Sequence, residues 1–101
     1  EILVKNENVP IFDVRKESEY LTQKIKVSRL TPLDSLNNHL NNFPENETFY
    51  IHCAGGYRSV IAASILKKRG IHNLVDVKGG FKAIRETAIE LAENIKSSDV
   101  N

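Results

Sequence analysis

The residues of this chain that could do chemistry gather around its single cysteine, Cys53. A short loop at residues 54–57 follows it, contains two glycines and leads directly to Arg58. Glycines allow a loop to turn several backbone N–H groups toward one point, and a helix that begins there adds its positive end. Such surroundings favour the thiolate form of a cysteine, which is the nucleophile. The pattern therefore predicts an enzyme that works through Cys53.

The segments on either side of this loop must hold it in place. Residues 48–51 have a hydrophobic strand pattern, and residues 58–69 have a helical pattern that ends at Gly70. Short apolar runs predict further strands at residues 9–14 and 74–77, and residues 17–22 predict a short helix. The loop is thus expected to connect a buried strand to the start of a helix.

Two more helices are indicated by apolar residues spaced three and four apart. The first has Thr31 as N-cap and Pro32 at its first position. Its apolar face consists of Leu33, Leu36, Leu40 and Phe43. The second follows the turn residues Gly79 and Gly80, and its apolar stripe consists of Phe81, Ile84, Ala88, Leu91 and Ile95.

Strands that alternate with helices predict a single α/β domain, with a mainly parallel central sheet and helices on both faces. Ligands of such sheets bind beyond the carboxyl ends of the strands. Cys53 falls at such an end. The expected fold therefore places the predicted nucleophile where ligands bind.

Length and composition exclude several classes of function. The 101 residues suffice for one core, and no apolar run approaches the roughly 20 residues of a membrane helix. One cysteine cannot form an internal disulfide, so we expect a reducing, cytoplasmic setting. One cysteine and three scattered histidines lack the spacing of a metal site, so we expect no metal and no cofactor. The net charge of +1 argues against nucleic acid as a partner.

The charge is nevertheless uneven along the chain. Residues 48–75 contain no Asp or Glu, whereas Arg58, Lys67, Lys68 and Arg69 all fall there. Of these four cations only Arg58 is near the loop. Lys67, Lys68 and Arg69 suit the negative end of a helix. A small anionic substrate is favoured by this distribution.

The chain starts at Glu1 and contains no methionine. We therefore expect a domain excised from a longer protein, in which other domains are potential partners. The domain itself is assigned to residues 1–96, and residues 97–101 are assigned to a polar tail.

The length of the loop separates two chemistries. Four residues lie between Cys53 and Arg58, one fewer than in cysteine phosphatases, whose cradle fits a tetrahedral phosphate. A smaller cradle suits one extra sulfur atom on the cysteine. A phosphatase or arsenate-reductase-like enzyme remains an alternative, as does a non-catalytic interaction module.

Three segments of the chain, in order, resemble the landmarks of the rhodanese family of sulfurtransferases. The loop from Cys53 to Ser59 is similar to its cysteine–x–x–glycine–x–arginine–serine loop. Asp13-Val14-Arg15, with Glu19-Tyr20 following, resembles the first landmark, and residues 77–81 resemble the closing one. The resemblance covers nearly the whole chain and implies a rhodanese-like domain.

The resemblance implies sulfur transfer through a Cys53 persulfide. The donor would be thiosulfate or a low-molecular-weight persulfide such as glutathione persulfide, and the acceptor a thiol or cyanide. Residues that would bind the donor or the transferred sulfur are Ala54, Gly55, Gly56, Tyr57 and Arg58. The loop string, with Gly79-Gly80-Phe81 downstream, also looks like rhodanese domains fused to metallo-β-lactamase-fold persulfide dioxygenases.

The roles of the neighbouring polar residues follow from position and charge. Arg58 either binds the donor anion or braces the loop, through carbonyls or through Asp13. Asp13 and Arg15 are expected to form structural ion pairs, and Ser59 to support the loop. Side chains alternate along a strand, so His52 should point away from the face of Cys53.

Overall fold

The computed structural model describes residues 9–87 and 89–93. Its central sheet has the strand order β3-β1-β4-β5. These strands are β1 (Ile11–Asp13), β3 (Arg29–Leu30), β4 (Phe49–His52) and β5 (Leu74–Asp76). Every neighbouring pair in this sheet is parallel, which confirms the predicted architecture. The strands predicted at 9–14, 48–51 and 74–77 are β1, β4 and β5, whereas β3 was not predicted.

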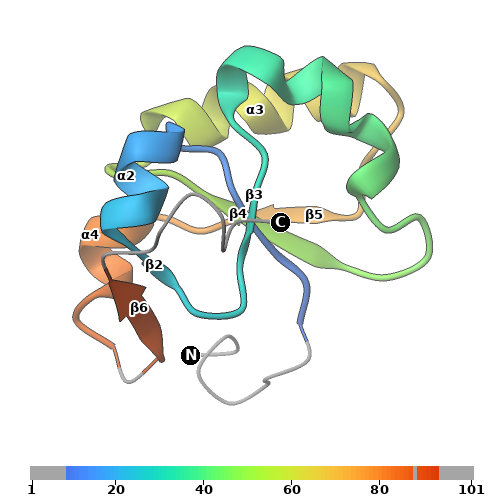
Figure 1. Cartoon of the computed structure of the whole chain (residues 1–101). Helices are drawn as coiled ribbons and strands as arrows, with labels where there is room; N and C mark the ends of the chain where they lie inside the picture. Colours follow the sequence, from blue (N-terminus) through green and yellow to red (C-terminus); the bar gives the residue numbers. More distant parts are fainter. Residues whose placement is uncertain (1–8, 88, 94–101) are drawn as a thin grey trace.

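Side chains alternate along the central strands and divide the core into two parts. Phe12, Phe49 and Ile51 pack on the face covered by η1 (Leu33–Asn42) and α3 (Tyr57–Lys68). Ile11 points the other way and packs with Phe81 and α4 (Gly80–Ile84). Figure 1 shows η1 and α3 together above the sheet, with α4 on its lower left. Helices therefore cover both faces, as predicted.

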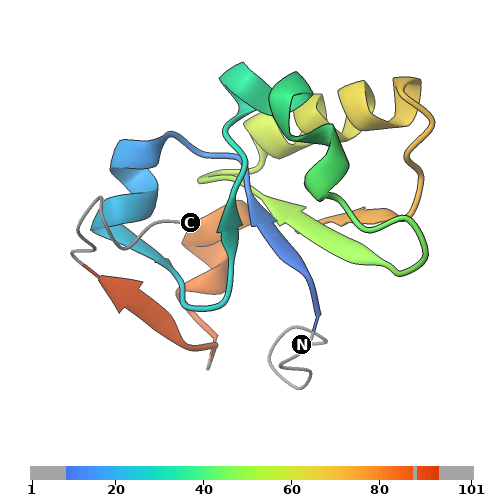
Figure 2. The same ribbon diagram turned by 45° about the vertical axis from the view of Figure 1, so that its right-hand side comes forward.

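A short helix and a two-stranded ribbon complete the fold. The helix α2 (Glu17–Thr22) has the predicted bounds. It leads into β2 (Gln23–Ile25), which pairs antiparallel with β6 (Leu91–Glu93). Figure 2 shows this ribbon at one side of the molecule, apart from the parallel sheet.

The predicted last helix is wrong beyond its first turns. The helix α4 ends at Ile84, and Leu91 lies in β6, where it faces Ile25 of β2. Leu91 packs in the same apolar cluster as Phe81 and Ile84. Its place in the core was therefore predicted correctly, but pairing with β2 overrides the helical periodicity.

The prediction of Thr31 as an N-cap is also wrong. The helix at this position is a 3-10 helix whose N-cap is Pro32, without a capping bond from a side chain. The N–H of Thr31 donates to the carbonyl of Asp13, and that of Leu33 to the carbonyl of Val14. These bonds prolong the contact with β1 and delay the helix. The expected apolar face is nonetheless present, because Leu36 and Phe43 are buried.

Several predictions fall on residues that the structure does not describe. They are the boundary at residue 96, the tail at 97–101, and the positions of Ala88 and Ile95. Within residues 9–87 and 89–93, no helix has the length and apolar character needed to cross a bilayer.

Candidate active site

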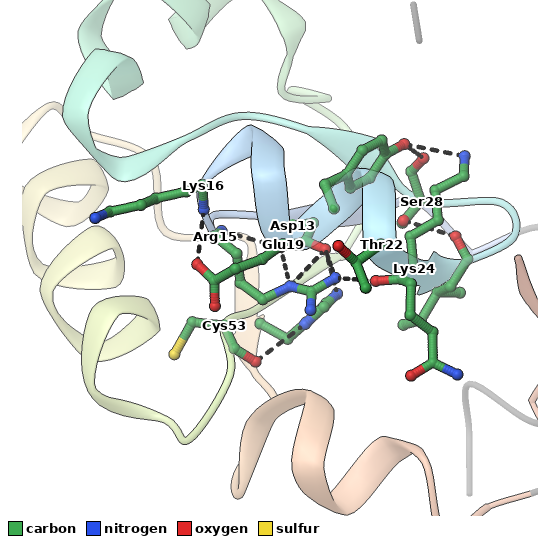
Figure 3. A network of polar contacts seen from close by, with 12 residues as sticks. Asp13, Arg15, Lys16, Glu19, Thr22, Lys24, Ser28 and Cys53 are labelled. Carbon is green, nitrogen blue, oxygen red and sulfur yellow. Dashed lines mark hydrogen bonds and ion pairs between the residues drawn. The ribbon is translucent and has the colours of Figure 1, made fainter. Parts of the chain in front are cut away.

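Two adjacent parallel strands bring the predicted site residues to one edge of the sheet. β1 and β4 pair in a register that sets Asp13 beside His52. The chain leaves β1 toward Arg15 and leaves β4 toward Cys53, so both residues emerge at the carboxyl ends of neighbouring strands. Figure 3 shows Cys53 beside Asp13, Arg15 and Glu19, with its sulfur directed away from the first two.

The Cys53 sulfur lies at the start of α3. The N–H of Gly56 donates to Sγ across 3.1 Å, and Ser59 Oγ lies 3.5 Å from the same sulfur. Gly56 is the N-cap of α3 and has a φ of 108°, a conformation that glycine adopts without steric cost. A backbone donor and a helix N-terminus are the partners that suit a negatively charged sulfur. Cys53 itself is only 1% exposed.

The first turn of α4 holds the loop from the other side. The N–H of Phe81 donates to the carbonyl of Cys53 across 2.6 Å, and that of Lys82 to the carbonyl of Ala54 across 3.1 Å. In a trans peptide the C=O and the following N–H point in opposite directions. These two bonds therefore turn the N–H groups of Ala54 and Gly55 away from α4. Within the described residues, neither of these N–H groups has a protein acceptor.

The close approach of α4 to the loop depends on Gly80. It has a φ of 58°, and a Cβ atom on it would lie 2.5 Å from the carbonyl oxygen of Cys53. The same Cβ would lie 2.6 Å from the carbonyl oxygen of Ala54. Any side chain at this position would push the loop away, so Gly80 does more than form the predicted turn.

Arg58 pairs with Glu19 of α2. Its Nη1 lies 2.6 Å from Oε1 and its Nη2 lies 3.0 Å from Oε2. The hydrogen bonds from Arg58 hold the pKa of Glu19 at about 2, against an ordinary 4.5, with a smaller contribution from the N–H of Lys16. Of the two roles left open for Arg58, this contact supports bracing. Of the bracing partners left open, Asp13 is not the one used, because its carboxylate pairs with Arg15.

Asp13 and Arg15 form the expected ion pair. Arg15 Nη2 lies 2.8 Å from Asp13 Oδ2, and Nε contacts both carboxylate oxygens at 3.0 Å. The guanidinium also donates to the carbonyl of Gln23 and lies 4.2 Å from the ring centre of Phe81. Both charged groups are buried, so their mutual pairing is what makes their burial tolerable.

His52 faces the side of the sheet opposite to Cys53, as predicted. It stacks on Phe81, its Nδ1 lies 3.3 Å from the carbonyl oxygen of Cys53, and its Nε2 lies 3.6 Å from Asp13 Oδ2. Burial lowers the pKa of His52, against a smaller opposite influence of Asp13. The ring can therefore orient the Cys53 peptide, but it lies on the wrong face to take a proton from the sulfur.

The remaining predicted site residues differ in how far they are exposed to solvent. Tyr57 is 86% exposed at the rim of the loop, and Gly55 is also exposed. Ser59 is fully buried beside the sulfur and is within hydrogen-bond distance of the carbonyl of Gly56. The structure thus brings Cys53 and Ser59 together, while Tyr57 points to solvent.

A family model described as "Rhodanese-like domain" matches residues 2–87. The chain belongs to the rhodanese-like domain family. The resemblance read from the three landmarks is therefore confirmed, and the fold agrees with it. A rhodanese-like domain protein from Staphylococcus aureus has a solved structure with a TM-score of 0.78 and 38% identity. That match covers 95% of this chain and 89% of the other.

Two relatives from Bacillus subtilis match a shorter part of this rhodanese-like domain. "Putative sulfur carrier protein YrkF" is 34% identical over 77 residues, which is 76% of this chain and 42% of that protein. "Uncharacterized protein YqhL" is 33% identical over 72 residues, which is 71% of this chain and 57% of that protein. The chain thus spans about half the length of these curated relatives.

Two residues of the rhodanese-like site had no assigned role from sequence. Glu19 belongs to the first landmark, and Gly80 to the closing landmark and to a predicted turn, but the sequence predicts no contact of either residue with the loop. The signal for Gly80 was present, because two successive glycines directly before a helix indicate a close backbone approach. No signal in the sequence pointed from Glu19 to Arg58, since 39 positions separate them.

Proposed function

We propose that this rhodanese-like domain is a sulfurtransferase that carries a sulfane sulfur on Cys53. The donor is thiosulfate or a low-molecular-weight persulfide such as glutathione persulfide, and the acceptor is a thiol or cyanide. Membership of the family and a relative named as a sulfur carrier support a sulfur-related function in general. The specific donor and acceptor are part of the proposal.

The observation that carries the proposal is the set of backbone donors beside the cysteine. Gly56 N–H already contacts Sγ, and the N–H groups of Ala54 and Gly55 have no protein acceptor in the described part of the chain. Donors that are free and held in place by α4 can stabilise negative charge on a second sulfur without reorganisation. This role is the one that we assign to the loop.

In the first step, the Cys53 thiolate attacks the outer sulfur of the donor. A new S–S bond forms on Cys53 and the S–S bond of the donor breaks. The electron pair leaves with sulfite when the donor is thiosulfate, or with the glutathione thiolate when the donor is glutathione persulfide. No external oxidant or reductant is needed.

In the second step, the acceptor removes the outer sulfur. Cyanide attacks that sulfur, a C–S bond forms, and thiocyanate leaves while Cys53 returns to the thiolate. A thiolate acceptor reacts in the same way and becomes a persulfide. The covalent intermediate thus divides one transfer into two displacements at sulfur.

Intact-protein mass spectrometry tests the proposal directly. We expect the protein to gain one sulfur atom with thiosulfate or with glutathione persulfide, and to lose it on addition of cyanide. The Cys53→Ser variant should gain none. Turnover of an aryl phosphate or of arsenate without sulfur loading would instead support the phosphatase-like alternative and contradict the proposal.

A further inference from the structure

The guanidinium of Arg58 forms a two-contact ion pair with one carboxylate. Both of its terminal nitrogens contact the two oxygens of Glu19, at 2.6 and 3.0 Å. Glu19 Oε1 also accepts the N–H of Lys16, so the carboxylate is anchored at the start of α2. The two side chains are 30% and 33% exposed, which leaves the pair open to exchange with a ligand. The pair joins α2 to the first turn of α3.

Glu19 changes the charge that the loop presents to a donor. Arg58 is the cation nearest to the loop in a stretch without Asp or Glu, residues 48–75. Glu19, through its hydrogen bonds, is the main cause of the raised pKa of Arg58, and Cys53 and Asp13 contribute less. Glu19 therefore neutralises the positive charge of Arg58 beside the loop. With a pKa of about 2, Glu19 stays ionised at every working pH.

The two donor types place their charge differently. Thiosulfate is a compact dianion, with both charges close to the sulfur that is transferred. Glutathione persulfide carries its carboxylates several bonds away from its outer sulfur. A donor of the first type gains from an unpaired cation beside the loop, and a donor of the second type does not require one.

Glu19 also lines a groove to which neither Arg58 nor residues 53–57 contribute. It has a volume of about 390 Å³ and is lined by Arg15, Phe81 and Arg85, together with residues of α2. This volume lies in the range of small-molecule sites. Asp13 already neutralises Arg15, whereas Arg85 makes no ion pair within the described residues. Glu19 thus pairs with Arg58 and also lines a groove whose Arg85 has no ion-pair partner in the described part of the chain.

We infer that Glu19 is a specificity-determining residue, which disfavours thiosulfate relative to a bulkier persulfide by holding Arg58 in an ion pair. This inference rests on the proposed function. Thiosulfate meets an Arg58 whose charge Glu19 already neutralises, so it gains less from this cation than from an unpaired one. A persulfide donor, whose outer sulfur carries no nearby carboxylate that needs Arg58, leaves the ion pair intact.

The test compares kcat/KM for thiosulfate and for glutathione persulfide, with cyanide as acceptor, in wild type and Glu19→Gln. We expect kcat/KM for thiosulfate to rise about threefold to fivefold, which is the effect of one freed charge contact at a partly exposed site. The kcat/KM for glutathione persulfide should differ from that of wild type by no more than about twofold. Glu17→Gln is the matched control, since it removes an exposed charge from the same helix, and both donors should be unaffected.

Other results would overturn the inference. An equal fall for both donors would mean that Glu19 only braces the loop, and an unchanged ratio would mean that it plays no part in selection. Should Glu19→Gln unfold, Glu19→Asp keeps the charge but is too short to hold both nitrogens, and a smaller shift toward thiosulfate is expected. If wild type takes sulfur from neither donor, the proposed function fails and the inference with it. If wild type turns over but the ratio does not shift, the inference alone fails.

Discussion

Gly80 lies so close to Cys53 that a single added carbon would meet the cysteine's carbonyl oxygen at 2.5 Å. The bonds from Phe81 and Lys82 to the loop carbonyls exist only because this approach is possible. The cradle around the sulfur is therefore shaped by α4, which lies on the opposite face of the sheet from α3.

Gly80→Ala should separate the loop from α4. We expect the free energy of unfolding to fall by about 2 kcal/mol or more, from the positive φ and the clash together, with loss of most sulfur transfer. Denaturant unfolding and the loading assay measure the two effects. Gly70→Ala is the control, because Gly70 has a φ of 87° and open space around it. It should cost about 1 kcal/mol with normal loading, and equal loading in both variants would contradict the role of α4.

Ser59→Ala should slow the loading of Cys53 without affecting the fold. Ser59 Oγ lies 3.5 Å from the sulfur, so the substitution removes one weak polar contact from the buried sulfur. We expect kcat to fall about threefold to tenfold, the equivalent of roughly 1 kcal/mol. Ser64→Ala, at an exposed position of the same helix, should leave kcat unchanged. A fall in both variants would point to the helix rather than the hydroxyl.

The buried His52 should make the domain less stable in acid. Its pKa is lowered by burial from 6.5, so the unfolded chain binds a proton more readily than the folded one. Stability is therefore complete above pH 6.5 and falls as the pH drops below it, by up to roughly 1.4 kcal/mol per pH unit. Measuring the free energy of unfolding from pH 8 to pH 5, a range of about three units in which His titrates, gives this slope.

His52→Gln should reduce that slope, because glutamine does not titrate. His72→Gln, at an exposed position, should retain it. Equal slopes in wild type and His52→Gln would show that another group causes the acid sensitivity.

Thr31→Val tests the corrected start of η1. Thr31 Oγ1 is buried and has no hydrogen-bond partner among the described residues, so its replacement by a methyl group removes an unsatisfied polar atom. We expect stability to be unchanged or raised by up to about 1 kcal/mol in urea unfolding. A loss of about 1 kcal/mol would instead restore the capping role that the sequence suggested.

Much of the fold could be predicted because its signals are local. The apolar run at β4 and the glycine loop before α3 marked the position of Cys53, and the bounds of α2 were correct. The alternation of side chains along β4 also placed His52 on the correct face. The order of three landmarks was enough to indicate the family before any contact was known.

The chain by itself thus determined the parallel sheet, the loop at its carboxyl edge and the identity of the candidate nucleophile. Only the tertiary structure decided that β6 pairs with β2, that Glu19 occupies Arg58, and that Gly80 supports the Cys53 loop. Each of these contacts joins segments far apart in sequence, and periodicity within one segment carries no information about the partner that packing brings to it. The neutralisation of Arg58 beside the Cys53 loop is the product of such a contact.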